Sequence, residues 1–312
     1  MLSDALLRHM PERPCHCRLW ETLMKALPLT YARAVGERGG AGKRDGIAER
    51  KRSMQDAEST EVNEIRGNIN SIETFGAVDG PGVRYIVFLQ GCRMRCLYCH
   101  NPETWADKAE GSYTETAAET FRKAWRYHNY WKNGGGITVS GGEALLQMEY
   151  VTELFHLAKE KGVHTALDTS GQPFSKEPKV RERFDVLMQV TDLFLLDLKH
   201  IDAQRHRELT GWDNGNILEL ARYLAQNQKP MWIRHVLVPG LTTKEEDQRR
   251  LRRFLDELRQ ICPSCVERVE VLPYHRLGVA KYDRLGIPYP LRETEPPTQQ
   301  QIRRAEEILV KA

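Results

Sequence analysis

A strand pattern and a helix pattern alternate along residues 83–311, and this alternation limits the possible folds more than any other feature of the chain. The strand segments, rich in β-branched and large apolar residues, cover residues 83–91, 136–143, 164–171, 192–199, 231–240 and 266–275. Helical spacing of apolar residues occupies 115–132, 148–162, 177–190, 202–209, 216–227, 244–260 and about 298–311. Repeated strand–helix units of this kind predict a parallel sheet with helical crossovers.

Residues that could do chemistry follow most of the predicted strands, at or just past the carboxyl end. They are the cysteines of 92–99, Gly141 and Gly142, Asp168 and Thr169, Asp197 and Lys199, and His275. Functional residues of parallel strand–helix folds gather at the carboxyl ends of the strands. An open sheet would spread these ends apart. We therefore predict an α/β fold of the partial (β/α)6, TIM-like barrel type, with the cysteines in the loop after its first strand.

Composition and charge exclude several classes of protein. The chain has 312 residues, 40% apolar and 29% charged, which is typical of a globular protein in water. We find no apolar run that could span a membrane and no secretory signal, so we expect a cytoplasmic protein without a membrane partner. Residues 1–53 hold 11 Lys and Arg against 6 Asp and Glu. The remainder is slightly acidic, which gives no reason to expect a nucleic-acid partner.

The first 60 residues differ from the rest of the chain. Glycine and charged residues dominate 34–53, and no strand or helix period is sustained. We expect residues 1–60 to be a disordered or dispensable leader, with Met54 as the alternative start, and residues 61–312 to form one domain. The acidic residues of the leader count against a transit peptide. Cys15 and Cys17 have no partner pair nearby, and we interpret them as incidental.

Three cysteines, Cys92, Cys96 and Cys99, form the pattern Cys-x3-Cys-x2-Cys. A structural zinc site closes with four ligands; no fourth cysteine is near, and His100 follows Cys99 too closely to complete a tetrahedron with it. A cubane iron–sulfur cluster takes one thiolate per iron, so three cysteines would leave one iron open to bind a small molecule. We favour a cluster over a zinc site or incidental cysteines.

The segments around these residues resemble a known family. With Tyr98 just before the last cysteine, the motif is similar to the signature of the radical S-adenosylmethionine enzymes. Over about residues 67–311 the chain resembles, more narrowly, the pyruvate formate-lyase-activating enzymes. The segments that carry this resemblance, in order, are "DGPGVR" (79–84), "GCRMRCLYCHNPETW" (91–105), "TVSGGEALLQ" (138–147), "LDTSG" (167–171), "LLDLK" (195–199), "WIRHVLVPG" (232–240) and "LPYHRLG" (272–278).

The resemblance implies an oxidoreductase that activates pyruvate formate-lyase. In that family a [4Fe-4S] cluster on the three cysteines binds S-adenosylmethionine through its open iron. One electron cleaves the cofactor to methionine and a 5′-deoxyadenosyl radical, which takes hydrogen from a glycine Cα of the partner and leaves a glycyl radical. The cofactors supply the reactivity, so no further catalytic side chain is expected. The resemblance also implies flavodoxin or ferredoxin as electron donor and anaerobic metabolism, and we expect a monomer.

The same resemblance assigns binding roles at the strand ends. The predicted contacts of S-adenosylmethionine are Tyr98, Cys99, His100, Gly141, Gly142, Asp197, Lys199 and His275. The glycines would let the methionine amino group approach closely, although a plain turn is the alternative. Lys199 would pair with the cofactor carboxylate, because a charge at the end of an apolar strand needs a polar ligand. His275 could instead be an ordinary surface histidine.

Three further assignments concern the rim of the site. By resemblance alone, Asp168, Thr169 and Asp197 would hold a monovalent cation beside the cofactor, with strand-end capping as the alternative. Asp79, in the glycine- and proline-rich turn before the first strand, is predicted to contact the glycine-containing loop of the substrate. Arg234 either contacts the cofactor or buttresses the barrel.

Some features separate this chain from its relatives. Ala144 stands where proline commonly follows Gly-Gly-Glu. Residues 100–112 contain no cysteine, so the ferredoxin-like insert of several related activases is absent, which favours pyruvate formate-lyase as partner. Cys262 and Cys265 are too few for a second cluster, and we interpret them as structural or incidental. The alternatives are an activase of a different glycyl-radical enzyme and an iron–sulfur protein that is not an enzyme.

Overall fold

The computed structural model describes residues 64–311. The leader predicted for residues 1–60, with Cys15, Cys17 and Met54, lies outside the described residues and stays a prediction. Within them, strands that pair in parallel and in chain order lie on the predicted segments, which confirms the parallel sheet. They are β2 (Arg84–Leu89), β4 (Gly136–Gly141), β5 (His164–Thr169), β6 (Leu193–Asp197), β7 (Met231–Leu237) and β8 (Val266–Pro273).

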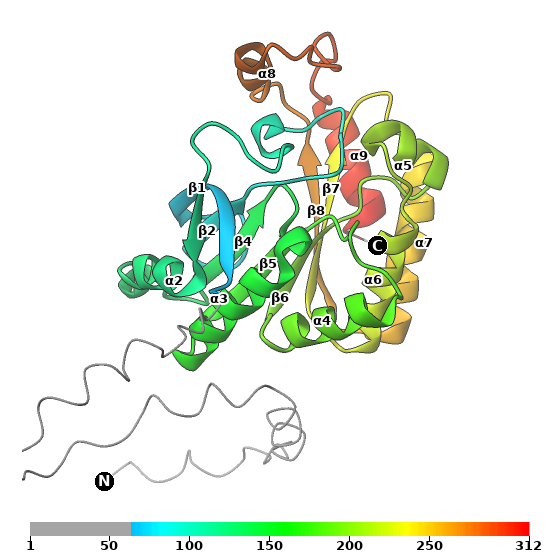
Figure 1. The fold of residues 1–312 in the computed structure, drawn as a ribbon. Helices are drawn as coiled ribbons and strands as arrows, with labels where there is room; N and C mark the ends of the chain where they lie inside the picture. The colour runs from blue at the N-terminus through cyan, green and yellow to red at the C-terminus, as the bar shows by residue number, and fades with distance from the viewer. Residues whose placement is uncertain (1–63, 312) are drawn as a thin grey trace, which may run out of the picture. The chain divides into compact units, whose positions relative to one another are not determined.

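Two strands that the sequence analysis missed extend the sheet beyond β2. The strands β1 (Arg66–Gly76) and β3 (Tyr113–Thr116) pair antiparallel, β1 with β2 and β3 with β1. The order is β3-β1-β2-β4-β5-β6-β7-β8, so the sheet stays open between β3 and β8, as in a partial barrel (Figure 1). Ile69 is the one large apolar side chain that β1 buries fully, so β1 lacks the apolar pattern of the central strands.

Most predicted helices are present with small changes at their ends. They are α3 (Met148–Glu160), α4 (Pro178–Gln189), α5 (Ala203–Thr210), α6 (Gly215–Gln226), α7 (Glu245–Ile261) and α9 (Gln299–Leu309). The helix predicted at 115–132 is shorter: α2 (Ala117–Trp125) begins at a capping box between Thr116 and Glu119, because the preceding residues belong to β3. The short helices η1 (Pro102–Thr104), η2 (His128–Tyr130), η3 (Ala144–Gln147) and α8 (Val279–Leu285) were not predicted.

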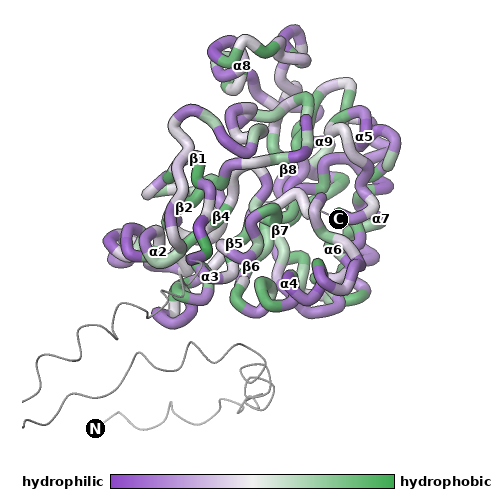
Figure 2. The backbone as a smooth tube through the Cα atoms, viewed as in Figure 1, coloured by the Kyte–Doolittle hydropathy of each residue, from purple (hydrophilic) through white to green (hydrophobic). Residues whose placement is uncertain are grey.

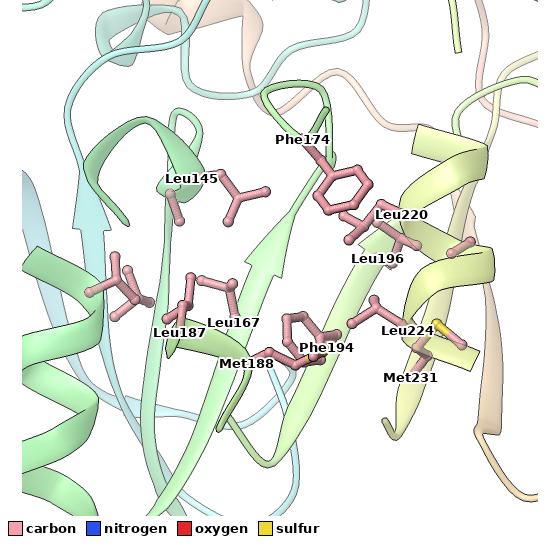
Figure 3. Packing of buried hydrophobic residues seen from close by; sticks show 14 of the residues in the cluster. Leu145, Leu167, Phe174, Leu187, Met188, Phe194, Leu196, Leu220, Leu224 and Met231 are labelled. Carbon is pink, nitrogen blue, oxygen red and sulfur yellow. The ribbon is translucent and has the colours of Figure 1, made fainter. Parts of the chain in front are cut away.

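The main core lies between the sheet and the helices that cover its outer face, among them α3, α4 and α6 (Figures 1 and 3). Strand β6 is apolar on both faces, as the sequence predicted. Phe194 and Leu196 pack toward the helices, whereas Leu193 and Leu195 pack with Ala166 on the inner face. Figure 2 shows apolar stretches along the inner strands and polar stretches over the outer helices. None of the helices within residues 64–311 is long and apolar enough to cross a membrane.

Candidate active site

Polar side chains continue the inner face of the sheet at the carboxyl ends of three neighbouring strands. Strand side chains alternate between faces with a period of two. On each of these strands the last inner-face apolar residue is therefore followed, two positions later, by a polar residue on the same face: Ala166 by Asp168, Leu195 by Asp197 and Trp232 by Arg234. Asp197 lies directly opposite Arg234 in the parallel register. The structure thus brings together strand-end residues that are far apart in the sequence.

Arg234 is the centre of this polar group. Its Nη1 lies 3.2 Å from Asp168 Oδ2 and 3.2 Å from Asp79 Oδ1, and its Nε lies 3.8 Å from Glu270 Oε2. The hydroxyl of Ser140 donates to Asp168 Oδ2 at 2.7 Å. Burial raises the pKa of Asp168 to about 6 even though Arg234 opposes the rise. The Asp168 carboxylate, in turn, raises the pKa of Arg234. Arg234, on β7, therefore connects the turn containing Asp79 with β5 and β8.

Lys199 lies two residues past the end of β6, which stops at Asp197 rather than continuing to residue 199 as predicted. Its Nζ donates to Asp197 Oδ2 at 2.6 Å, and its side chain is 11% exposed. Burial is the largest single influence on Lys199 and would lower its pKa, but the Asp197 carboxylate, Tyr98 and Cys96 together hold that pKa well above its usual value. The ammonium also lies 5.9 Å from the ring centroid of Tyr98. A ligand with a carboxylate would find a fixed positive charge here.

The cysteine loop after β2 is held by residues more than 100 positions away. The amides of Arg95 and Leu97 donate to the carbonyls of Thr210 and Leu209, at 2.8 and 2.9 Å. The indole of Trp212 donates to the carbonyl of Arg93 at 3.0 Å. The end of α5 and the residues after it therefore set the path of the loop.

The three thiols in this loop suit an iron–sulfur cluster. Cys92, Cys96 and Cys99 are free, and burial is the largest influence on each, raising the pKa of Cys92 to about 11, that of Cys96 to about 12 and also that of Cys99. Thiols so protonated become ligands when a metal's positive charge stabilises the thiolates. The buried hydroxyl of Tyr98, between the second and third thiols in sequence, has no hydrogen-bond partner within residues 64–311.

The other two cysteines in the described part of the chain lie far from this loop in the fold. Cys262 and Cys265 are buried and form a disulfide with a Cα–Cα distance of 5.5 Å. They lie between the end of α7 and the start of β8, at the amino end of that strand, whereas the cysteine loop follows the carboxyl end of β2. This agrees with the structural interpretation of the pair.

Gly141 and Gly142 fit the cysteine loop closely. A Cβ at Gly141, whose φ is +119°, would lie 2.2 Å from the amide nitrogen of Leu89, and one at Gly142 would lie 2.2 Å from the carbonyl oxygen of Gly91. The amide of Glu143 donates to that same carbonyl at 2.9 Å. Glycine is therefore required for packing against β2 and the start of the loop, a reason that the sequence analysis did not foresee.

His100 and His275 meet at the far end of the cysteine loop. Their rings stack with centroids 4.2 Å apart and planes 27° apart, and His100 Nε2 lies 3.1 Å from the carbonyl oxygen of His275. Burial, helped by the neighbouring His275, lowers the pKa of His100. Helix α8 is joined to the same region, because Lys281 donates to Asn101 Oδ1 at 2.7 Å. The structure thus brings these two predicted contacts of S-adenosylmethionine side by side.

The side chain of Thr169, one of the predicted cation ligands, forms hydrogen bonds with other residues. Its hydroxyl donates to Glu143 Oε1 and accepts from the amide of Gly171 at 2.9 Å, whereas Asp168 bonds to Ser140. Within residues 64–311, no three His, Cys, Asp or Glu side chains are arranged around a single metal ion. A cubane spreads its thiolates over several irons and needs no such arrangement. The predicted cation site stays a prediction.

Two residues inside the quoted motifs have structural roles that were not predicted from the sequence. Glu143 is buried and accepts from the amides of Leu145 and Ser170 at 3.0 Å each, so it orders the ends of β4 and β5. Arg84 is fully buried and donates to Thr138 Oγ1 at 2.8 Å and to the carbonyl of Ile137 at 2.6 Å. Burial lowers the pKa of Arg84 to about 10. The position of Arg84, a charged residue at the start of an apolar strand, was the sequence signal that could have indicated its structural role.

Parallel strand–helix units with three free cysteines after the first parallel strand define the class of radical S-adenosylmethionine proteins, and residues 86–251 match the Radical SAM superfamily. The crystal structure of a radical SAM methyltransferase from Sphaerobacter thermophilus has a similar fold, with a TM-score of 0.51 and 18% identity. That match covers 72% of this chain and 63% of the methyltransferase chain.

Relatives with higher sequence identity show which family within this class the chain belongs to. A pyruvate formate-lyase-activating enzyme of Streptococcus mutans is 50% identical over 252 residues, which are 81% of this chain and 94% of that protein. One of Listeria monocytogenes is 46% identical over 80% of this chain and 98% of its own length. The chain belongs to the pyruvate formate-lyase-activating enzymes, whose cofactors as radical SAM enzymes are a [4Fe-4S] cluster and S-adenosylmethionine.

Proposed function

We propose that this enzyme activates pyruvate formate-lyase by generating a glycyl radical on it. The observation that carries the proposal is the 50% identity to the Streptococcus mutans activating enzyme over 94% of that protein's length. When bound, the cluster and S-adenosylmethionine supply a one-electron cleavage whose 5′-deoxyadenosyl product removes a hydrogen atom from a glycine Cα. The chain's own residues bind and orient these groups.

Cys92, Cys96 and Cys99 are the proposed cluster ligands. Lys199 binds the methionine carboxylate of S-adenosylmethionine, and its pairing with Asp197 at 2.6 Å keeps the ammonium charged. We call the carboxyl ends of the strands, where Asp168, Asp197 and Arg234 lie, the mouth of the site. A charge-assisted hydrogen bond of this kind is shorter and stronger than a neutral one. Gly141 and Gly142 bring the backbone close to the loop, so the methionine amino group meets no side chain there.

We propose the remaining assignments on the basis of the family resemblance. Tyr98, His100 and His275 contact the nucleoside, and the stacked histidines offer a flat ring surface beside the last cysteine. Asp79 lies at the mouth, held by Arg234 at 3.2 Å, where a glycine-bearing loop of the partner enters. Asp168, Thr169 and Asp197 are proposed to hold a monovalent cation. Flavodoxin or ferredoxin is the proposed reductant, in the cytoplasm, and the enzyme acts as a monomer.

The test is anaerobic incubation of the iron-loaded enzyme with pyruvate formate-lyase, S-adenosylmethionine and a reductant. We expect the electron paramagnetic resonance signal of a glycyl radical on pyruvate formate-lyase, and none when Cys99→Ala enzyme replaces the parent. If the parent makes 5′-deoxyadenosine but radicalises only a different glycyl-radical enzyme offered in parallel, the assignment of the partner is wrong.

A further inference from the structure

A cavity of about 670 Å³ lies beside the cysteine loop. Its wall includes Cys92 together with Arg93, Arg95 and Trp105, but none of Lys199, Asp168 or His275. One proposed cluster ligand therefore reaches a surface that is separate from the mouth where the cofactor and the substrate are proposed to bind. We call the surface made by Arg93, Arg95, Trp105 and Trp212 the Arg93 face.

We propose that the Arg93 face is the docking site of an acidic one-electron carrier protein. The carrier would reduce the cluster by transferring an electron to it by way of Cys92. The proposal rests on the proposed function, because it needs a cluster on this loop that requires an electron. The mouth must remain available for the protein substrate. A carrier that docks on the Arg93 face can deliver its electron without competing for that space.

The charge on this face favours an acidic partner. Arg93 and Arg95 are exposed, and neither forms a salt bridge with any residue of the described part of the chain. The Arg95 guanidinium instead donates to the carbonyls of Cys92 and Met94, at 2.7 and 2.8 Å, and lies 5.0 Å from the ring centroid of Trp105. Asp107 is the one carboxylate on the cavity wall, so two guanidinium groups outweigh it.

The Arg93 face also has the residue types that stabilise small interfaces. Arginine and tryptophan are enriched at the energetic centres of interfaces, and redox partners meet through small, transient contacts. Trp212 is 41% exposed although its indole is bonded to the carbonyl of Arg93. The face is therefore fixed before a partner arrives. Unpaired positive charge would speed the encounter with an acidic carrier, and salt would weaken that effect.

The experiment compares Arg93→Glu with the parent enzyme, both iron-loaded, and uses an acidic flavodoxin as the probe. The side chain of Arg93 is exposed and makes no hydrogen bond within residues 64–311, so the variant should fold. Arg303→Glu, on the exposed side of α9, is the matched control for the change of charge. Binding is measured by calorimetry at several salt concentrations, and cluster reduction by the loss of its visible absorbance.

We expect Arg93→Glu to weaken flavodoxin binding at least tenfold at low salt, to slow cluster reduction by flavodoxin similarly, and to lose most of the difference at high salt. Production of 5′-deoxyadenosine with dithionite should stay at the parental level. Unchanged flavodoxin binding in Arg93→Glu and in the uncharged Arg93→Gln would overturn the docking site. Failure of the parent enzyme to make 5′-deoxyadenosine with dithionite would instead overturn the proposed function.

A second, independent feature lies behind the site. A cavity of about 10 Å³ is lined by four buried polar side chains, each with one atom that lacks a hydrogen-bond partner within residues 64–311. These atoms are His200 Nε2, His235 Nε2, Asp247 Oδ2 and Gln248 Oε1. His200 follows Lys199 in sequence, and His235 follows Arg234, so this cavity backs the two cations of the site.

The hydrogen bonds made by the rest of each side chain define what faces the cavity. Nδ1 of His200 accepts from the amide of Asp202 at 3.0 Å, so its Nε2 carries the proton. Nδ1 of His235 donates to the carbonyl of Leu198 at 2.7 Å, so its Nε2 is an acceptor. Gln248 directs its amide nitrogen to the carbonyl of Thr242 and its oxygen to the cavity. One donor and three acceptors therefore converge.

We infer that one buried water molecule binds here and fixes the backbone that carries Lys199 and Arg234. The cavity has the size of a single water molecule, and a water can accept from His200 and donate to two of the three acceptors. A metal ion is disfavoured because the proton on His200 points at it. A crystal structure at better than 2 Å resolution should show a water within hydrogen-bond distance of both histidines. Absence of density there, or an anomalous-scattering peak from a metal, would overturn the inference.

Discussion

Lys199 and Asp197 form an ion pair, and in the proposed binding mode the cofactor carboxylate shares the Lys199 ammonium with Asp197. With Lys199 11% exposed and Asp197 25% exposed at the mouth, the ammonium can keep one hydrogen bond to Asp197 and offer another to an incoming carboxylate. Lysine has three such donors. Removing the ammonium would leave the Asp197 carboxylate facing the cofactor carboxylate, so the loss would include repulsion between like charges.

We expect Lys199→Met to weaken S-adenosylmethionine binding by roughly 10- to 100-fold. A charge-assisted hydrogen bond contributes about 1.5–3 kcal/mol, and about 1.4 kcal/mol corresponds to a factor of ten. The iron content should match that of the parent, because Lys199 is not a proposed ligand. The measurement is the concentration of S-adenosylmethionine needed for half-maximal 5′-deoxyadenosine formation. Parental cofactor binding in the variant would mean that Lys199 is a structural residue.

The cysteines divide by position into two groups. We expect Cys92→Ala, Cys96→Ala and Cys99→Ala each to lose the cluster, because the free thiols within residues 64–311 all lie in this loop. Cys262→Ala breaks the disulfide at the other end of the strands and should keep its iron. Iron per chain and visible absorbance after anaerobic reconstitution separate these outcomes. Iron loss in Cys262→Ala with retention in Cys92→Ala would contradict the ligand assignment.

At the scale of elements, the parallel strands and most helices were predictable because their pattern is local. Strands such as β6 are apolar runs in the sequence, and the site residues lie at the ends of these runs. Strands β1 and β3 were not predictable from such a pattern, because β1 is stabilised by pairing on both sides while most of its side chains stay partly exposed. The contacts of Arg234 with Asp79, and of the cysteine loop with α5, join residues more than 100 positions apart.

We expect His206, on helix α5, to make the stability of the fold sensitive to acid. This side chain is fully buried, and its Nδ1 donates to the carbonyl of Trp212 at 2.6 Å. Burial chiefly, and the nearby charge of Lys199, lower the pKa of His206 to about 4. Its usual value is about 6.5, so the unfolded chain binds more protons between these two values. The contribution of His206 to stability is therefore complete above pH 6.5 and is lost as the pH falls toward 4.

We expect the free energy of unfolding to fall by about 2–3 kcal/mol between pH 7 and 4.5 on account of His206, at about 1.4 kcal/mol per unit of pKa difference. In His206→Asn the amide can still donate to the Trp212 carbonyl but cannot take up a proton. Between pH 7 and 4.5, the unfolding free energy of the variant should therefore fall by less than that of the parent, and the difference should be the contribution of His206. At pH 7 the variant should be less stable than the parent. Urea unfolding of both proteins at several pH values provides the measurement. Equal slopes would show that His206 does not titrate as its burial requires.

At the scale of the whole molecule, the site depends on an intact sheet. Its residues come from the ends of β4, β5, β6, β7 and β8 and from the loops around β2, so any loss of strand order would move several of them together. The sheet and the main core lie within residues 64–311. Strand β1 is the first element of this sheet, and it sits between β3 and β2 rather than at an edge.

A protein that begins at Met54 should therefore bind iron and S-adenosylmethionine like the full chain, because it keeps all of β1. The matched control begins at Ser71. It lacks Ile69 and the segment from Arg66 to Ile69 that pairs with β3, so both the buried side chain and the partner of the edge strand are removed. We expect the control to be insoluble or to melt many degrees lower, since pairing and burial are lost together. Soluble yield, iron per chain and melting temperature compare the three proteins. Loss of solubility or of iron in the Met54 protein would show that the leader stabilises the domain.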